Sequence, residues 1–230
     1  KPAPDTSTLT GKFFCPLMLE NEAGPPKAGE PTQETTLGLN YSLSHFYVDS
    51  NGYAPDPPRW MERSAAKLTK LQRRLARMQP GSRNYEEQLQ KIRTLHEHIA
   101  NQRRDFIHKE SRRITNAWDA VCVKDTDLIE MSRALKLGNA MDSRFGYFRT
   151  RLRYKLERQG KPLIVVDKYF PSAKTCHACG HVPEELEPAV RRWTCPVCGT
   201  ELDRGRNGAE NLRDQGLARF CKNRELDLPA

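Results

Sequence analysis

Two Cys-x-x-Cys pairs constrain the fold of this 230-residue chain more than any other feature of its sequence. Cys176 and Cys179 form the first pair, and Cys195 and Cys198 form the second after 15 intervening residues. Two such turns can present four thiolates to one tetrahedral zinc ion, which is the spacing of a zinc ribbon. Because four sulfur ligands leave no open coordination position, we predict one structural zinc per chain, bound by these four cysteines.

The residues around the pairs favour a metal site over redox chemistry. Gly180 and Gly199 directly follow the two pairs and permit tight turns, and His177, inside the first pair, is not expected to be a ligand. The alternative, two redox-active dithiols, does not explain the paired spacing. Three further cysteines stand apart and are expected to be inert thiols: Cys15, Cys122 and Cys221. This cysteine pattern fits a reducing cytoplasm rather than a secreted disulfide framework.

The net charge of +9 is confined to one segment of the chain. Residues 59–113 hold 15 Lys or Arg and 6 Asp or Glu, whereas the remainder holds 23 of each sign. A basic stripe on an otherwise neutral protein is the electrostatic footprint of a phosphate-backbone partner, and a solvated helix face is the alternative. The candidate nucleic-acid contacts in this stripe and in a second basic segment are Arg63, Lys67, Lys70, Arg73, Arg74, Arg77, Arg103, Arg104, Arg144, Arg149, Arg151 and Arg153.

The amino-terminal residues alternate extended segments with breaks. Residues 12–20 predict a strand, and Pro16 places this strand at a sheet edge. A Pro/Gly-rich linker follows. Residues 1–33 are therefore expected to be an edge strand and a linker from a largely missing N-terminal region. Residues 35–53 predict a β-hairpin with strands LGLN and HFYVD, in which Asn51-Gly52 is a strong turn signal. Since the first residue is Lys rather than Met, we expect a processed chain or part of a longer one.

The basic segment predicts two helices that form a helical hairpin at residues 59–115. Residues 59–78 are expected to be helical up to the break at Pro80-Gly81, with one apolar face made of Leu68, Leu71, Leu75 and Met78. The apolar stripe of the longer second helix consists of Tyr85, Leu89, Ile92, Leu95, Ile99 and Phe106. We expect these stripes to pack within the hairpin, which leaves the cations on the other faces available to a partner.

Strands and helices then alternate, which predicts an α/β sheet domain. Residues 120–125 predict a strand, 142–159 a basic amphipathic helix ended by Gly160, 162–170 a strand buried on both faces, and 206–220 a last helix. The mean hydropathy is −0.77, and the sequence has no apolar run of about 18 residues, so a membrane span is excluded.

Several motifs occur in an order that resembles the TnpB family of transposon-encoded, RNA-guided nucleases, which is related to the type V CRISPR effectors. They are LGLNYSLSHFYVDSNG, VCVKDTDLIEMS, RLRYKLERQGK, VDKYFPSAKTCHACGH, CPVCG and LDRGRNGAENL, together with the basic hairpin. The resemblance covers residues 12–220 and implies an α/β, RNase H-like (RuvC) fold with an inserted helical hairpin and a zinc ribbon. It implies a RuvC-like domain at 34–170, the ribbon at 171–202, a last RuvC-like helix at 203–220 and a tail at 221–230.

The same resemblance implies a nuclease centre in which three carboxylates hold two divalent metal ions. The family motifs carry Asp, Glu and Asp where this chain has Asn40, Lys124 and Gly205. An amide is a poor ligand for Mg²⁺, and the ammonium group of Lys124 would repel the ion. Asp125 should point to the opposite face of its strand. Asp203, two residues before Gly205, is the nearby carboxylate that could still bind a metal ion, but one carboxylate would not hold two. We therefore expect no catalytic magnesium and a chain that is not an enzyme.

These expectations describe a catalytically inactive, RNA-guided DNA-binding protein that represses transcription when its bound target is a promoter. Its partners would be a guide RNA and double-stranded target DNA rather than a membrane, and its location the cytoplasm, on the nucleoid when bound to DNA. Two alternatives stay open. One is an active RNA-guided DNA endonuclease of the TnpB type with displaced metal ligands. The other is a zinc-ribbon nucleic-acid-binding fragment, or a transposon accessory protein, that uses no guide.

Overall fold

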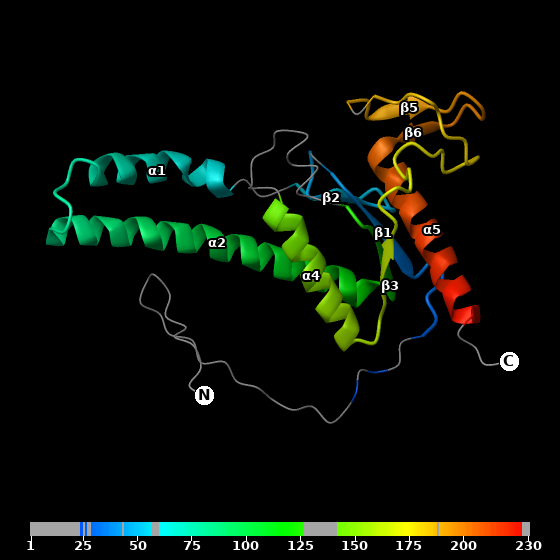
Figure 1. Cartoon of the computed structure of the whole chain (residues 1–230), viewed down its shortest axis with the longest axis horizontal. Coiled ribbons are helices and arrows are strands. Elements are labelled where there is room, and N and C mark those ends of the chain that lie inside the picture. Colours follow the sequence, from blue (N-terminus) through cyan, green and yellow to red (C-terminus); the bar gives the residue numbers. More distant parts are fainter. Residues whose placement is uncertain are drawn as a thin grey trace. The chain divides into compact units, whose positions relative to one another are not determined.

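The computed structural model describes residues 29–42, 44–56, 60–126, 142–187 and 189–226, together with residues 24 and 26. The strand predicted at residues 12–20 lies outside this part of the chain. The elements are β1 (Thr36–Tyr41), β2 (Tyr47–Asp49), α1 (Trp60–Leu75), α2 (Arg83–Ala117), β3 (Ala120–Lys124), α4 (Asp142–Arg158), β4 (Leu163–Val166), β5 (Arg192–Thr194), β6 (Glu201–Asp203) and α5 (Arg204–Leu226) (Figure 1). No helix in the described part of the chain is long and apolar enough to span a membrane.

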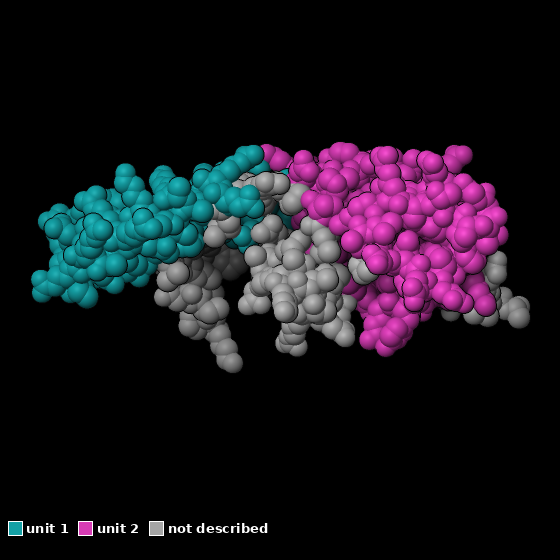
Figure 2. Space-filling view, turned by 90° about the horizontal axis from the view of Figure 1, so that it is seen from above, with its two compact units in different colours: residues 1–24, 58–107 teal, residues 25–57, 108–230 magenta. Residues whose placement is uncertain are grey.

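The chain divides into two compact units, which Figure 2 shows in different colours. The smaller unit comprises residues 1–24 and 58–107, and the larger unit comprises residues 25–57 and 108–230. In the smaller unit, α1 and the first part of α2 form the predicted helical pair, and Gly81, at a φ of 80°, permits the turn between them. Ile92, Leu95 and Ile99 are buried, as expected for an apolar stripe that packs within the hairpin.

The larger unit is built on a four-stranded mixed sheet in the order β2-β1-β3-β4. Strand β1 pairs antiparallel with β2 and parallel with β3, and β3 pairs parallel with β4. In this register Leu39 lies opposite Asp49 on one side and Val123 on the other. The mixed sheet with its helices confirms the predicted α/β class. A second, two-stranded sheet joins β5 and β6.

The predicted pairing of the first two strands is present, but the Asn51-Gly52 turn does not connect them. This turn follows β2: Gly52, at a φ of 87°, donates its N–H to the carbonyl of Asp49 over 3.0 Å. The buried carboxylate of Asp49 also accepts backbone N–H groups from Asn51 and Tyr53, at 2.9 and 2.8 Å. The local turn signal was therefore correct, whereas the connection between β1 and β2 is formed by residues 42–46, which carry no such signal.

Strand β4 is shorter than predicted and is not buried on both faces. Ile164 and Val166 are buried, whereas Leu163 and Val165 are only half-buried. The reason is topological, because β4 is last in the order β2-β1-β3-β4 and, within the described residues, pairs with β3 alone. The prediction of a strand covered on both faces is therefore wrong.

Two different layers cover the two faces of the sheet. Helix α5 packs against all four strands, and Figure 1 shows it along one face, with α4 on the other side. On the α4 side, the ring of Tyr47 stacks on Phe148 with centroids 5.6 Å apart, and the ring of Tyr41 meets Phe145 at 5.1 Å. The buried hydroxyl of Tyr47 hydrogen-bonds Glu110, which Arg113 also contacts at 2.7 Å, so the end of α2 is fixed to β2.

On the α5 side, two glycines permit an unusually close approach. A Cβ atom on Gly38 would lie 1.9 Å from the carbonyl oxygen of Ala209, and one on Gly216 would lie 2.6 Å from Sγ of Cys122. Real Cβ atoms do not make such contacts, so the helix can occupy this position only because both residues lack a side chain. The predicted last helix is confirmed, and it extends beyond its expected limits to Arg204–Leu226.

We predict that Gly38→Ala lowers the free energy of unfolding by about 3 kcal/mol or more, because the added methyl group meets backbone atoms of α5 rather than a flexible side chain. Urea titration followed by circular dichroism measures the change. The matched control is Gly29→Ala, since no heavy atom lies within 4 Å of the Cβ position at Gly29. Equal unfolding midpoints for the two variants would contradict the close packing of α5.

Candidate metal centre and nucleic-acid surfaces

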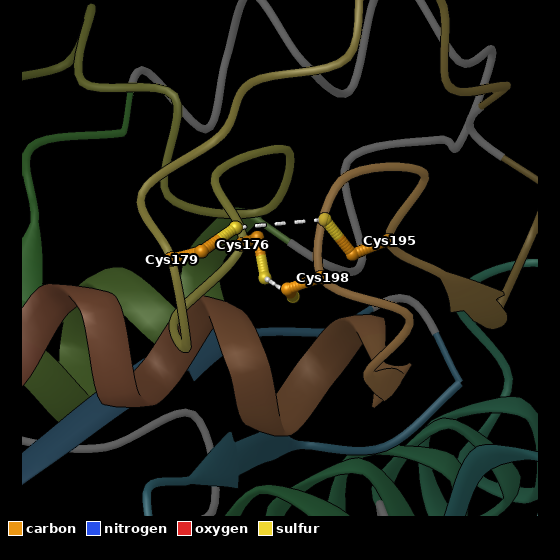
Figure 3. Close-up of side chains that lie close together, drawn as sticks. All are labelled: Cys176, Cys179, Cys195 and Cys198. Atoms are coloured by element: carbon orange, nitrogen blue, oxygen red, sulfur yellow. Dashed lines mark hydrogen bonds between the residues drawn. The ribbon is translucent and has the colours of Figure 1, made fainter.

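The four cysteines of the predicted ribbon lie together and point toward one another (Figure 3). Their Sγ atoms are all within 4.8 Å of each other, and the Cys176–Cys198 and Cys179–Cys195 pairs are 3.7 and 3.6 Å apart. Four sulfurs at the usual Zn–S bond length of about 2.3 Å would be separated by about 3.8 Å in a regular tetrahedron. The donor set and its spacing therefore fit a zinc ion.

The two Cys-x-x-Cys turns have the same backbone geometry. The N–H groups of Cys176 and Cys195 donate to the carbonyls five residues ahead, of His181 and Thr200, at 2.8 and 2.9 Å. Gly180 and Gly199 then return an N–H to the carbonyl of the first cysteine of each pair, and both have a positive φ, at 76° and 71°. Left-handed residues at these positions close each turn, as the sequence predicted.

The cysteines differ in exposure and in acidity. Cys176 and Cys195 are buried, whereas Cys179 and Cys198 are exposed. Sγ of Cys198 lies 3.2 Å from Oγ1 of Thr200, and hydrogen bonding with Thr200 lowers the pKa of the Cys198 thiol to about 6. Since the thiolate is the form that binds metal, this lowered pKa favours coordination by Cys198.

Helix α5 holds the first turn from outside the cysteine cluster. Nε2 of His177 lies 2.7 Å from a carboxylate oxygen of Asp214, and the backbone N–H of His177 donates to Asn207 at 2.9 Å. The side-chain amides of Asn207 and Asn211 both donate to the carbonyl of Thr175, each at 2.7 Å. His177 therefore contacts α5 rather than the metal site, in agreement with its predicted exclusion from the ligand set.

The three positions at which the resemblance implies a nuclease centre come together at one end of the sheet. Asn40 and Lys124 lie on the α5 face, near the carboxyl ends of the adjacent parallel strands β1 and β3. Nδ2 of Asn40 donates to the carbonyl of Gly205, in the first turn of α5, at 3.2 Å. Burial lowers the pKa of Lys124, and the charge of Asp167 partly offsets this effect.

Nearby carboxylates have other partners. Asp125 faces away from Lys124, as predicted from strand alternation, and pairs with Arg149 of α4 at 3.2 Å. Asp203 caps α5 by accepting the N–H of Arg206 at 2.9 Å. Among the residues that the structure describes, the four cysteines form the one group of three or more potential metal ligands. Asp125 and Asp203, the two acidic residues next to the predicted catalytic positions, are thus already engaged by Arg149 and by the first turn of α5.

The predicted nucleic-acid contacts fall in both units. In the smaller unit, Lys70, Arg73, Arg74 and Arg77 are exposed and line one pocket along the end of α1 and the residues that follow it. The remaining contacts of this unit are Arg63, Lys67, Arg103 and Arg104, of which Arg103 is half-buried and the others are exposed. None of these placements tests the predicted binding roles, which stay predictions.

The predicted contacts on α4 differ in their exposure and in the partners that they already have. Arg149 is engaged by Asp125, and the guanidinium of Arg151 lies over the Tyr147 ring, 4.4 Å from its centroid. Arg153 is exposed, and the side chain of Arg144 lies outside the described part of the chain. Sequence reasoning did not select Arg112 and Arg158, which are exposed and share a groove between α2 and α4. In the sequence these two arginines are single charges on two separate helices, α2 and α4, so no local pattern indicates that they share a groove.

Family models match most of the chain. A model described as "Probable transposase" matches residues 18–135, and a model described as "Cas12f1-like, TNB domain" matches residues 145–212. The second match includes the four cysteines and most of α4.

Two curated relatives align with nearly the whole chain. One from Streptomyces pristinaespiralis is 32% identical over 220 residues, which cover 94% of this chain and 54% of the relative. One from Escherichia coli is 28% identical over 229 residues, which cover 92% of this chain and 56% of the relative. Both carry the provisional name RNA-guided DNA endonuclease. The chain thus spans about half the length of the curated relatives it matches.

Two solved structures share the fold. A CRISPR-Cas12f ternary complex matches with a TM-score of 0.59 and 16% identity over 88% of this chain and 41% of that chain. A Cas12f1–sgRNA–target DNA complex matches with a TM-score of 0.55 and 17% identity over 80% of this chain and 50% of that chain. At these identities, the likeness shows the fold alone.

The expectation that this chain is not an enzyme is wrong. The relatives from S. pristinaespiralis and E. coli, and a third from Mycobacterium tuberculosis, are named as RNA-guided DNA endonucleases, which are enzymes. The assignment of Asn40, Lys124 and Gly205 as replaced catalytic positions stays a prediction from the resemblance, as does the absence of catalytic magnesium.

We predict that the purified chain contains about one zinc ion, and that Cys176→Ser reduces this content strongly because a structural site needs its complete thiolate set. Inductively coupled plasma mass spectrometry measures the zinc, and circular dichroism follows the helical hairpin, which should be unaffected. Cys221→Ser is the matched control, since Cys221 is an exposed thiol outside the cluster. Full zinc content after loss of two of the four cysteines would refute the site.

Proposed function

Because the chain belongs to the TnpB family of probable transposases, we propose that it binds a guide RNA and a double-stranded DNA target as part of an RNA-guided DNA endonuclease of the TnpB type. In such systems the guide reads the target by base pairing, and the protein holds the heteroduplex by its backbone. The resemblance to complexes of Cas12f with RNA and DNA supports these two partners. Thiolate ligands are compatible with our further proposal that the protein works in the reducing cytoplasm, on nucleoid DNA.

The observation that carries the proposal is the localised positive charge of the helical hairpin. Residues 59–113 account for the whole net charge of +9, and α1 presents exposed cations along its length. Three of them, Lys70, Arg73 and Arg74, border a single pocket together with Arg77, which follows the helix. Cations spaced along a helix can neutralise successive phosphates, and the released counterions then drive binding.

We assign the larger unit to an RNase H-like, RuvC-type fold. In support of this, β1 pairs antiparallel with β2, parallel strands β3 and β4 continue the sheet, and α5 covers one face. The hairpin of α1 and α2 lies between β2 and β3 in sequence, so it would be an insertion in that fold. The cysteine cluster would hold zinc as a structural ribbon, with no role in chemistry.

Repression of transcription is a second candidate function. A guide-directed complex that stays bound to a promoter blocks transcription because it occupies the promoter. This effect does not depend on how fast the complex cleaves the DNA. The observation that favours this role is the pair of Asn40 and Lys124 at adjacent strand ends. An ammonium group at that place can pair with a DNA phosphate and so prolong binding.

RNA content tests the central proposal directly. RNA that copurifies with the chain is extracted and sequenced, and a DNA duplex complementary to its guide segment is then offered to the complex. We expect one dominant RNA species, and DNA binding that disappears after ribonuclease treatment. Equal DNA binding with and without RNA would instead identify a zinc-ribbon nucleic-acid-binding protein that uses no guide.

We predict that changing Arg73, Arg74 and Arg77 to Gln makes the salt dependence of nucleic-acid binding shallower, by up to about three in the slope of log affinity against log salt. Each lost phosphate contact removes about 0.9 from the slope for duplex DNA. A matched variant with Arg191, Arg219 and Lys222 changed to Gln removes the same charge from exposed positions outside the hairpin. Identical slopes for both variants would show that only net charge matters.

We predict that the combined substitutions Asn40→Asp, Lys124→Glu and Gly205→Asp raise Mg²⁺-dependent target cleavage at least about tenfold above the unaltered chain, because metal ligands act as a unit. Each single substitution should change the rate little. A labelled DNA target shows the cleavage, EDTA should abolish it, and zinc content checks that the variants are folded. A rate for the triple variant equal to that of the unaltered chain would disprove the assignment of these positions.

A further inference from the structure

A groove of about 590 Å³ lies between the carboxyl-terminal part of α2 and the last turns of α4, within the larger unit. We call it the α2–α4 groove. It is lined by His108, Lys109, Arg112, Thr115, Asn116, Tyr154, Lys155, Arg158 and Gln159. Its volume is in the range of sites for small ligands, so it suits a short single-stranded segment better than a double helix.

The groove carries a positive charge that its own walls do not neutralise. Four of its lining residues are cations, and none of the described residues that line it is acidic. Arg112 and Arg158 are exposed, and neither forms an ion pair with a carboxylate in the described part of the chain. Like charges this close repel each other, so an anionic ligand would stabilise the groove.

Lys155 shows the consequence of this crowding. Its ammonium group donates to the carbonyl of His108 at 2.7 Å and to Oγ of Ser111 at 2.8 Å, which fixes it against α2. Its pKa is lowered by burial and, in addition, by the positive charges of Arg112 and Arg151. The groove thus contains a cation held in place by two hydrogen bonds and affected by two further positive charges.

The remaining lining groups match nucleotides better than an isolated phosphate ion. Tyr154 contributes a half-buried ring at one end, with the guanidinium of Arg151 5.5 Å from its centroid. Aromatic rings in such grooves stack with unpaired bases. Asn116 and Gln159, 3.4 Å apart at their side-chain amides, offer both donors and acceptors, which can recognise a ribose 2′-hydroxyl.

The groove is separate from the strand ends that hold Asn40 and Lys124. The helices that form it lead into the amino-terminal ends of β3 and β4, whereas Asn40 and Lys124 lie near the carboxyl-terminal ends of β1 and β3. Lys161 stabilises the groove's end of the sheet by donating to the carbonyls of Thr115 and Trp118 at 2.9 and 2.8 Å.

We propose that the α2–α4 groove binds the sugar–phosphate backbone of a single-stranded segment of the guide RNA, with Arg112 and Arg158 on phosphates and Tyr154 under a base. This inference rests on the proposed function, since it needs a guide RNA, and it assigns that RNA a surface outside the basic helical hairpin. The occupant is single-stranded RNA rather than DNA, because amides beside the cations can use the 2′-hydroxyl.

The test uses the full chain and a short fluorescein-labelled oligouridine, with the matching oligothymidine as the DNA probe. Arg112→Gln combined with Arg158→Gln should make the salt slope for oligouridine shallower by about 1.4, since each contact with a single strand contributes about 0.7. Tyr154→Leu should weaken binding roughly tenfold, and Tyr154→Phe should retain it because the ring remains. Fluorescence anisotropy measures both effects.

The matched control is Arg219→Gln combined with Lys222→Gln, which removes two exposed cations from α5 and should leave the slope nearly unchanged. An unchanged slope in the folded Arg112/Arg158 variant would overturn the groove assignment, and so would an equal loss of binding for oligothymidine. If the unaltered chain neither binds oligouridine nor copurifies with RNA, the proposed function itself fails. These outcomes separate an error about the groove from an error about the guide RNA.

Discussion

The close packing of α5 on the sheet is the contact on which the other features of the larger unit depend. Gly38 and Gly216 have no side chain where one would collide with Ala209 and Cys122. Because these two residues lack a side chain, the backbone of α5 can lie directly on β1 and β3. The first turns of α5 then hold two different structures: the strand end at Asn40 and the loop that carries the first cysteine turn. The sheet, the helix and the candidate metal centre are therefore one packed assembly.

The features that could be predicted from the sequence are those fixed by local geometry. The Cys-x-x-Cys spacing and the following glycines determine each turn within a few residues, so the cysteine cluster was predictable in full. The presence of each helix followed from apolar periodicity, and the break between the first two helices followed from Pro80-Gly81, whereas the last helix extends beyond its predicted limits. The Asn51-Gly52 turn was also local, and only its place in the topology was misjudged. The burial of β4 failed for a related reason, because an apolar run cannot reveal whether a strand is central or at an edge.

The functional surfaces were less predictable because they depend on residues distant in sequence. Lys109 and Arg112 belong to α2, whereas Tyr154 and Arg158 belong to α4, and contacts between the two helices, such as the hydrogen bond from Lys155 to His108, bring them to one groove. Arg149 was selected for its charge, but its partner Asp125 comes from a strand end. The error about enzyme class has another origin. That expectation rested on three positions of the family motifs, whereas the relatives align with nearly the full length of this chain and are named as endonucleases.

The contacts between α5 and the first cysteine turn have a thermodynamic consequence. His177, Asn207 and Asn211 connect the metal-binding loop to the same helical turns that receive Asn40. Any ligand that stabilises the folded loop therefore also stabilises these turns of α5, by linkage. Metal binding at the cysteine cluster would therefore be thermodynamically coupled to the order of the strand ends. Low zinc in the cell would thus lower the stability of the carboxyl end of the sheet, although no residue there would bind the metal.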